Sequence, residues 1–186
     1  MKLYHSSFSI IENPDLKHGR TNADFGQGFY LSSDKEFVLR WSKRHLGKKT
    51  YINEYELDTR GLKICHFERN IEWFSYILNN RSSQADDLLA YDVIEGPIAN
   101  DTIYDTWGLL SSGIFSKEES LRLLQLGPSY TQLVIKSEKA LSQLQWLNAE
   151  ELSDELLSQY KEVTKKEELA YQTSFSKLLE QMEKEN

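Results

Sequence analysis

The residues best suited to ligand binding or catalysis lie in the segment DFGQGFYLSSD, which runs from Asp24 to Asp34. Two glycines, Gly26 and Gly28, flank a polar residue and precede a strand-forming trio that contains Tyr30. Because glycine has no Cβ, its backbone can pass close to a ligand, and the same residues also suit a tight hairpin. The segment therefore predicts either a hairpin turn or a loop that approaches a ligand.

The four histidines and the single cysteine limit metal chemistry. His5, His18, His45 and His66 are the whole supply of histidine, and no two of them lie three or four residues apart, which excludes a helical two-histidine metal site. Cys65 cannot form an internal disulfide or a thiolate metal centre alone, and we expect it in the core. No metal is expected, and a hydrolase or nuclease built on these histidines and on carboxylates has little support.

Composition favours one globular body without a broad nucleic-acid interface. The 186 residues include 29 acidic and 22 basic ones, which give a net charge of -7, and 39% are hydrophobic. The one basic cluster, Arg40 to Lys49, is interpreted as the solvated end of a helix in preference to a phosphate site. No stretch of the sequence approaches the length of a membrane span, which needs about 20 apolar residues. The first residues, MKLYHSS, lack the apolar core of a secretory signal. We therefore expect a cytoplasmic protein that does not bind a membrane.

Hydrophobic periodicity predicts the elements that must position these residues. Two helices are expected to begin at capping boxes, in which a serine and a glutamate three residues later satisfy each other's backbone groups: Ser33 with Glu36 and Ser116 with Glu119. The predicted strands lie at residues 2–7, within 24–33, at 51–58 paired with 62–67, at 91–95 and at 131–137, the last of them. The predicted helices span 34–46 and 70–79, run from Asn100 or Asp101 through Leu110, and follow Ser116.

The C-terminal part of the chain differs from the rest. Residues 148–186 contain no glycine or proline and space their apolar residues at helical intervals. We interpret them as a long helix or a helical hairpin with a break at Lys165–Glu168, packed on the same chain in preference to a partner. Two units are predicted, 1–147 and a helical extension 148–186.

The order of three motifs resembles the ADP-ribosyltransferase superfamily. A His on the first strand, a Tyr in a Gly-x-Tyr context and a Glu or Gln that begins a later strand correspond here to His5, Tyr30 and Gln132. The sequence looks most like an uncharacterised bacterial family, a domain of unknown function, within this superfamily. The resemblance covers about Met1 to Leu144 and implies an α+β fold, with a split antiparallel β-sheet core flanked by helices.

The resemblance implies a NAD-dependent mono-ADP-ribosyltransferase for which NAD is the substrate. Cleavage of the nicotinamide–ribose bond passes through an oxocarbenium-like centre, which calls for a fixed ribose and a stacked leaving group. His5 would contact a ribose hydroxyl, and the backbone of Ser6 would pair with the carboxamide of nicotinamide. Tyr30 and Trp41 would sandwich the nicotinamide ring.

Further residues of the predicted NAD site border the glycine-containing loop. Arg20 could bind a pyrophosphate oxygen, and Asp24 lies beside the loop. Gly26 and Gly28 would let the loop pass near the dinucleotide. The acceptor is left open by the sequence, with a protein slightly favoured over nucleic acid because of the acidic composition. Membership of a bacterial toxin–antitoxin or phage-defence system would add an antitoxin protein as partner.

Gln132 departs from the glutamate of many superfamily members. A neutral amide can hold a ribose hydroxyl but lacks the charge that stabilises a cationic centre. This favours transfer of a single ADP-ribose unit, a weakened catalyst, or a catalytically degenerate NAD-binding or protein-interaction module. Glu95 or Asp101 could supply the missing carboxylate. Replacement Gln132→Glu would discriminate between these alternatives through nicotinamide release.

Overall fold

The computed structural model describes residues 1–42, 48–99 and 114–185, which hold two β-sheets and five helices in an α+β arrangement. The first sheet has the order β1-β3-β7, with β1 (Lys2–Ser7), β3 (Tyr51–Leu57) and β7 (Leu144–Glu151) all antiparallel. β7 follows the strand that the sequence predicts to be the last. Its residues cross the predicted boundary between 147 and 148, so the sheet extends to Glu151.

The second sheet has the order β2-β6-β5-β4. It is formed by β2 (Phe29–Leu31), β4 (Ile64–His66), β5 (Val93–Pro97) and β6 (Thr131–Ile135). β4 runs parallel to β5, and the other pairs are antiparallel. The predicted pairing of 51–58 with 62–67 is therefore wrong, as is a wholly antiparallel core. Alternation predicts that a segment is a strand but does not name its neighbour in the sheet.

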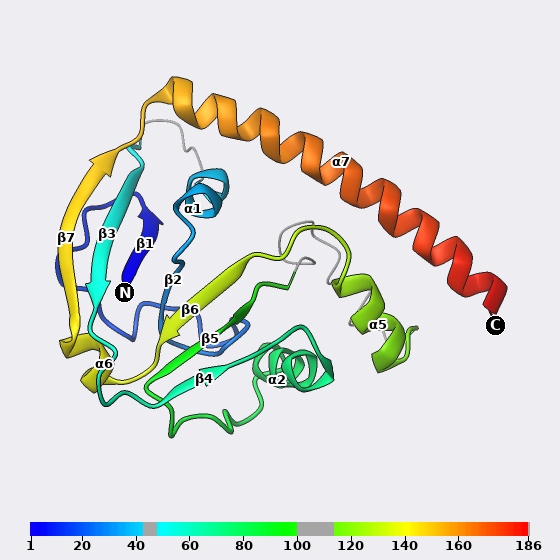
Figure 1. Cartoon of the computed structure of the whole chain (residues 1–186), viewed down its shortest axis with the longest axis horizontal. Coiled ribbons are helices and arrows are strands. Elements are labelled where there is room, and N and C mark those ends of the chain that lie inside the picture. Colours follow the sequence, from blue (N-terminus) through cyan, green and yellow to red (C-terminus); the bar gives the residue numbers. More distant parts are fainter. Residues whose placement is uncertain (43–47, 100–113, 186) are drawn as a thin grey trace.

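The two sheets meet at one backbone bridge. The N–H of Tyr4 donates to the carbonyl of Ser32 at 2.8 Å, and the N–H of Ser32 donates to the carbonyl of Tyr4 at 3.0 Å. β1 and β2 are thus the facing edges of the two sheets, which lie side by side (Figure 1). No second backbone bridge joins β1 to β2 among the described residues.

Helix α1 (Lys35–Trp41) follows β2 and packs against β1. Its N-cap is Asp34, whose Oδ1 accepts from the N–H of Phe37 at 3.0 Å, so the predicted Ser33/Glu36 capping box is wrong. An aspartate is as good a cap as a serine, and here Asp34 itself stands one residue closer to the helix. The helix ends at Trp41 with Ser42 as C-cap, whereas the sequence predicts it to continue to residue 46.

Three further helices complete the body. α2 (Ile71–Arg81) corresponds to the helix predicted at 70–79 and begins after the cap Asn70, and α5 (Lys117–Leu124) has the predicted capping box of Ser116 and Glu119. The short helix α6 (Glu138–Ser142) precedes β7 and is not predicted by the sequence. The helix predicted from Asn100 or Asp101 lies outside the described residues.

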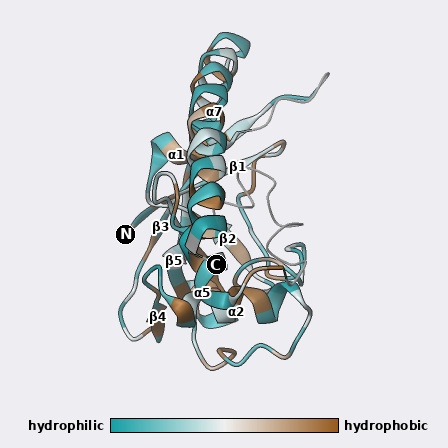
Figure 2. Ribbon diagram, turned by 90° about the vertical axis from the view of Figure 1, so that its right-hand side faces the viewer, coloured by the Kyte–Doolittle hydropathy of each residue, from teal (hydrophilic) through white to brown (hydrophobic). Residues whose placement is uncertain are grey.

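The C-terminal helix α7 (Asp154–Glu185) is a single helix of 32 residues. The predicted break at Lys165–Glu168 and the helical hairpin are wrong, because lysine and glutamate are good helix formers and no glycine or proline interrupts them. Its ribbon is mostly hydrophilic, with hydrophobic residues at intervals (Figure 2). Leu157 packs in one core cluster with Phe37, whereas Tyr171 and Phe175 pack in another with residues of α2 and α5. As predicted, the helix packs on its own chain.

No helix within the described ranges combines the length and the apolar character needed to cross a membrane.

Candidate functional site

A cavity of about 280 Å³ lies where β1, β2 and α1 meet. Seven of the nine predicted site residues line it, and they come from β1, β2, α1, β6 and the loop before β2: His5, Ser6, Arg20, Asp24, Tyr30, Trp41 and Gln132. Hydrophobic residues such as Phe37 and Ile98 complete the wall. The structure thus brings together residues that are up to 127 positions apart in the chain.

The split between the sheets is held open by His5. In an antiparallel ladder the pair Tyr4–Ser32 would be followed by a pair of Ser6 with Tyr30. Instead, Nδ1 of His5 donates to the carbonyl oxygen of Tyr30 at 2.7 Å. The side chain of one strand therefore takes the acceptor that the backbone of the same strand would otherwise use.

Ser6 consequently has free backbone groups at the cavity. Tyr4 directs both its N–H and its C=O towards Ser32, and Ser6, two residues further on, directs its own groups to the same side of β1. Neither group has a partner among the residues that the structure describes. The side chain of Ser6 is fixed, since its Oγ lies 2.8 Å from Oγ of Ser42 at the end of α1. An amide-bearing ligand would find one donor and one acceptor at this edge.

The protonation state of His5 follows from its surroundings. Burial lowers the pKa of His5 from its ordinary value of 6.5, and the hydrogen bond to the Tyr30 carbonyl opposes this effect. The imidazole is therefore neutral near pH 7, with its proton on Nδ1 and a lone pair on Nε2. Its ring lies against Phe29, with centroids 4.7 Å apart. His5 can accept a hydrogen bond from a ligand hydroxyl through Nε2.

Tyr30 uses its hydroxyl within the protein. The phenol donates to the carbonyl of Gly26 at 2.7 Å and accepts from the N–H of Phe25 at 3.0 Å. Burial, and then the charge of Asp24, raise the pKa of the Tyr30 phenol well above its ordinary value of 10.0. The hydroxyl is thus unsuited to proton transfer, and Tyr30 contributes its ring to the cavity while its hydroxyl holds the loop.

Gly26 and Gly28 are not among the residues that line the cavity, and their approach to a ligand stays a prediction. Gly26 has a φ of 73°, and a Cβ there would lie 2.9 Å from Lys136 Nζ. A Cβ on Gly28 would lie 2.4 Å from the carbonyl oxygen of Ile135 on β6. Glycine is required at both positions because the loop packs tightly against the protein itself.

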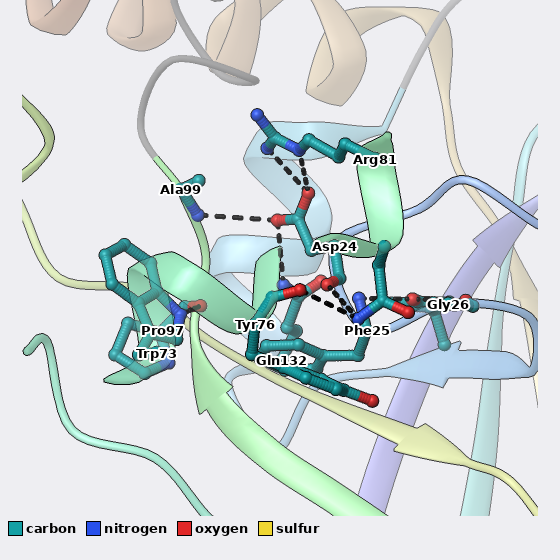
Figure 3. A network of polar contacts seen from close by, with 11 residues as sticks. Asp24, Phe25, Gly26, Trp73, Tyr76, Arg81, Pro97, Ala99 and Gln132 are labelled. Carbon is teal, nitrogen blue, oxygen red and sulfur yellow. Dashed lines mark hydrogen bonds and ion pairs between the residues drawn. The ribbon is translucent and has the colours of Figure 1, made fainter. Parts of the chain in front are cut away.

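A buried polar network joins the loop to Gln132 (Figure 3). Oδ1 of Asp24 accepts from Nε of Arg81 at 2.8 Å and from Nη2 at 2.6 Å. Oδ2 accepts from Nε2 of Gln132 at 3.1 Å and from the N–H of Ala99 at 3.5 Å. The side chains of Arg81 and Asp24 are only 9% and 10% exposed. Sequence reasoning missed Arg81, because it stands 57 positions from Asp24 at the end of a helix, where a basic residue is ordinary.

The α1 wall is aromatic. The rings of Trp41 and Phe37 are 5.9 Å apart, and Phe37 stacks on Tyr130 at 4.7 Å. Trp41 remains 37% exposed, which leaves part of its ring available at the cavity. Arg20 is exposed and lines the cavity, and no hydrogen bond or ion pair ties its guanidinium to another described residue. A flat ring and an anion could both find a contact here.

Of the two carboxylates that the sequence offers in place of a catalytic glutamate, Glu95 lies in the described part of the chain. Glu95 does not line the cavity, because its Oε2 pairs with Nδ1 of His66 at 2.9 Å on the neighbouring strand β4. Asp101 lies outside the described residues. Among the described residues, the carboxylate that lines the cavity is that of Asp24.

The start of the predicted basic cluster is tied to α7. Nη1 of Arg40 donates to Oε1 of Glu167 at 2.7 Å, and Oε2 of Glu167 accepts from the hydroxyl of Tyr130 at 3.0 Å. Residues 43–47 of the cluster lie outside the described ranges. No group of three or more His, Cys, Asp or Glu side chains that could hold a metal ion occurs in the described parts of the chain.

Comparison with known proteins places the chain in a family. The model of a family described as "Protein of unknown function (DUF3990)" matches residues 1–146, which include every residue that lines the cavity. The matched range ends within β7 and does not reach α7. A search of curated proteins finds no match.

Proposed function

The chain belongs to the DUF3990 family, and we propose that it is a NAD-dependent mono-ADP-ribosyltransferase with an ADP-ribosyltransferase-like arrangement of its two sheets. One observation carries the proposal. His5, Tyr30 and Gln132, which the resemblance selects on three different strands, line one cavity together with Ser6 and Trp41. Nothing in the spacing of these residues along the chain requires them to meet.

The cavity would hold the nicotinamide end of NAD. Its volume of about 280 Å³ is close to the lower limit of about 300 Å³ for small-molecule pockets, so it suits nicotinamide and its ribose better than the whole dinucleotide. The free N–H and C=O of Ser6 would pair with the carboxamide, and the ring would lie near Tyr30 and Trp41. The pyrophosphate would extend towards Arg20.

In the proposed reaction the bond between the nicotinamide nitrogen and C1′ of the ribose breaks. Its electron pair returns to the pyridinium ring, which leaves as neutral nicotinamide, and the ribose becomes oxocarbenium-like. A nucleophilic atom of the acceptor then bonds to C1′ and releases its proton to solvent. Nε2 of His5 would accept from a ribose hydroxyl and Oε1 of Gln132 from another, so that C1′ is held in line with the acceptor.

The proposal extends to the biological setting that the resemblance implies. The acceptor would be a protein in preference to nucleic acid, given the net charge of -7. The enzyme would be the toxin of a bacterial toxin–antitoxin or phage-defence pair, with an antitoxin protein as its partner. A second candidate is a catalytically degenerate NAD-binding or protein-interaction module, which the neutral amide of Gln132 favours.

Calorimetric titration of NAD into the wild type, His5→Ala and His66→Ala tests the proposal. His66 is the matched control, because it is an exposed histidine on β4 that pairs with Glu95 and does not line the cavity. We expect the wild type and His66→Ala to bind with a free energy of about −8 kcal/mol or better, and His5→Ala to lose most of this affinity.

A second readout separates the two candidate functions. Release of nicotinamide by the wild type, measured with and without a bacterial protein extract as acceptor, supports the transferase. Binding of NAD without release at any acceptor concentration would identify the degenerate NAD-binding module. Absence of NAD binding to the wild type would refute the transferase and favour the protein-interaction module.

A further inference from the structure

The two oxygens of the Asp24 carboxylate have different partners. Oδ1 receives both hydrogen bonds from Arg81, and Oδ2 receives the amide of Gln132. Figure 3 shows the carboxylate between the guanidinium on one side and the amide on the other. The three side chains form a hydrogen-bonded series that begins in the interior at Arg81 and ends at the cavity with Gln132.

This hydrogen-bonded series fixes which way the Gln132 amide points. A carboxylate can only accept, so the amide must turn its NH₂ group towards Asp24. Oε1 then has no partner among the described residues, and Gln132 lines the cavity. The amide is therefore held as an acceptor for a ligand hydroxyl, which is the orientation that a ribose requires.

The hydrogen-bonded series also turns a negatively charged group towards the cavity. Asp24 and Gln132 line the cavity, whereas Arg81 does not. The ion pair thus presents its negative end to the ligand and keeps its positive end behind it. In a site shielded from water, a fixed carboxylate at this position stabilises positive charge that develops on a bound ribose.

We infer that Asp24 and Gln132 act as one unit, in which the Asp24 carboxylate, anchored by Arg81, orients the amide and supplies the negative charge that Gln132 lacks. This inference rests on the proposed function, because it assigns a charge-stabilising role in the same reaction. Asp24 is a positioning residue for Gln132 and an electrostatic one for the oxocarbenium-like ribose.

Because Asp24 and Gln132 act as one unit, we expect a carboxylate introduced at position 132 alone to lower kcat. In Gln132→Glu a new carboxylate oxygen would lie near the present Nε2, about 3.1 Å from Oδ2 of Asp24, and two such charges repel. The exchanged double variant Asp24→Asn/Gln132→Glu restores one amide and one carboxylate. Its new amide at position 24 can accept from Arg81 with its oxygen and donate to position 132 with its nitrogen.

The experiment compares the wild type, Asp24→Asn, Gln132→Glu and the exchanged double variant. Nicotinamide release gives kcat and KM, and calorimetry gives the Kd of NAD. We expect each single variant to lower kcat by about tenfold or more with a smaller change in Kd, and the double variant to recover to within about threefold of the wild type. Losses that simply multiply in the double variant would overturn the inference.

Asp92→Asn is the control for loss of a shielded carboxylate. The Asp92 side chain is 13% exposed, accepts from Oγ of Ser137 at 2.6 Å, and does not line the cavity. Its replacement should alter the melting temperature without changing kcat. If kcat fell as much in Asp92→Asn as in Asp24→Asn, the loss in both variants would be due to general destabilisation.

A measurement on the unmutated protein keeps the inference testable if a variant fails to fold. The two Nε2 protons of Gln132, observed by nuclear magnetic resonance, should exchange with solvent much more slowly than those of exposed glutamines. Exchange as fast as that of an exposed glutamine would refute the held amide. Failure of the wild type to bind NAD or release nicotinamide would instead refute the proposed function, and the slow exchange would be unaffected.

Discussion

The imidazole of His5 holds the carbonyl oxygen of Tyr30 at 2.7 Å, where a regular ladder would place a backbone N–H of β1. This one hydrogen bond separates the edges of the two sheets and leaves Ser6 with free backbone groups. The candidate site therefore depends on a side chain that competes with the backbone of its own strand.

Replacement His5→Ala should let the sheet close. Without the imidazole, the Tyr30 carbonyl is free to accept from the N–H of Ser6, which the register from Tyr4–Ser32 places opposite. We expect the amide proton of Ser6 to exchange more slowly in the variant, although a histidine has been removed from a half-buried position. Hydrogen exchange followed by nuclear magnetic resonance measures this, with His66→Ala as control. Faster or unchanged exchange at Ser6 would contradict the competition.

Mild acid should destabilise the protein through His5. Its folded-state pKa lies below the ordinary value of 6.5 because of burial, so the unfolded chain binds the proton more readily. The free energy of unfolding should therefore fall as the pH drops from about 7.5 to about 5.5, by at most about 1.4 kcal/mol per pH unit from this group.

Urea titrations of the wild type and His5→Gln at both pH values measure the effect. The variant lacks the titrating ring, so its stability should change less with pH than that of the wild type. Equal pH dependence of the two proteins would show that His5 is not the group responsible.

Two glycines of the chain should respond differently to alanine. A Cβ on Gly28 would lie 2.4 Å from the Ile135 carbonyl oxygen, so strands β2 and β6 would have to separate. A Cβ on Gly61 meets nothing within 4 Å, and only its φ of 73° disfavours a side chain. We expect Gly61→Ala to lower the free energy of unfolding by about 1 kcal/mol and Gly28→Ala to lower it by about 3 kcal/mol or more. Denaturation midpoints measure both, and similar losses would refute the tight packing of the loop.

The packing of α7 on its own chain is tested by Phe175→Ala. Phe175 is 7% exposed and belongs to the core cluster of α2 and α5, whereas Leu169 on the same helix is 66% exposed. Removal of the phenylalanine should lower the free energy of unfolding by about 3–5 kcal/mol, and Leu169→Ala should change it by less than about 0.5 kcal/mol. Thermal unfolding at several protein concentrations gives both values. Equal, small losses would show that the helix is not packed in the core.

Local sequence signals predicted several elements, and the resemblance predicted residues that meet at the candidate site. The Ser116/Glu119 box predicts a helix start because a cap acts within one turn. The resemblance selects His5, Tyr30 and Gln132, and the structure brings them to one cavity. Strand pairing was beyond these signals, since β4 pairs with β5 through contacts between residues about 29 positions apart.

Other features had no local signal at all. The partnership of Arg81 with Asp24 joins a helix end to a loop, and each residue alone is ordinary in its place. The sequence predicts that the loop glycines approach a ligand. The Gly-x-Gly pattern shows that a Cβ is disfavoured at these positions, but it does not show which atoms would exclude the Cβ. What a Cβ would meet, the Ile135 carbonyl or Lys136, depends on a strand more than 100 residues away.

The direct attachment of α7 to the end of β7 has a mechanical consequence. Under tension applied at the two ends of the chain, the last turns of α7 would peel first, and Met182, Phe175 and Tyr171 would leave the core before Leu157. The 32 residues of the helix would lengthen from about 48 Å to about 110 Å as they unwind. α7 would thus lengthen while the two sheets and the cavity between them stayed intact.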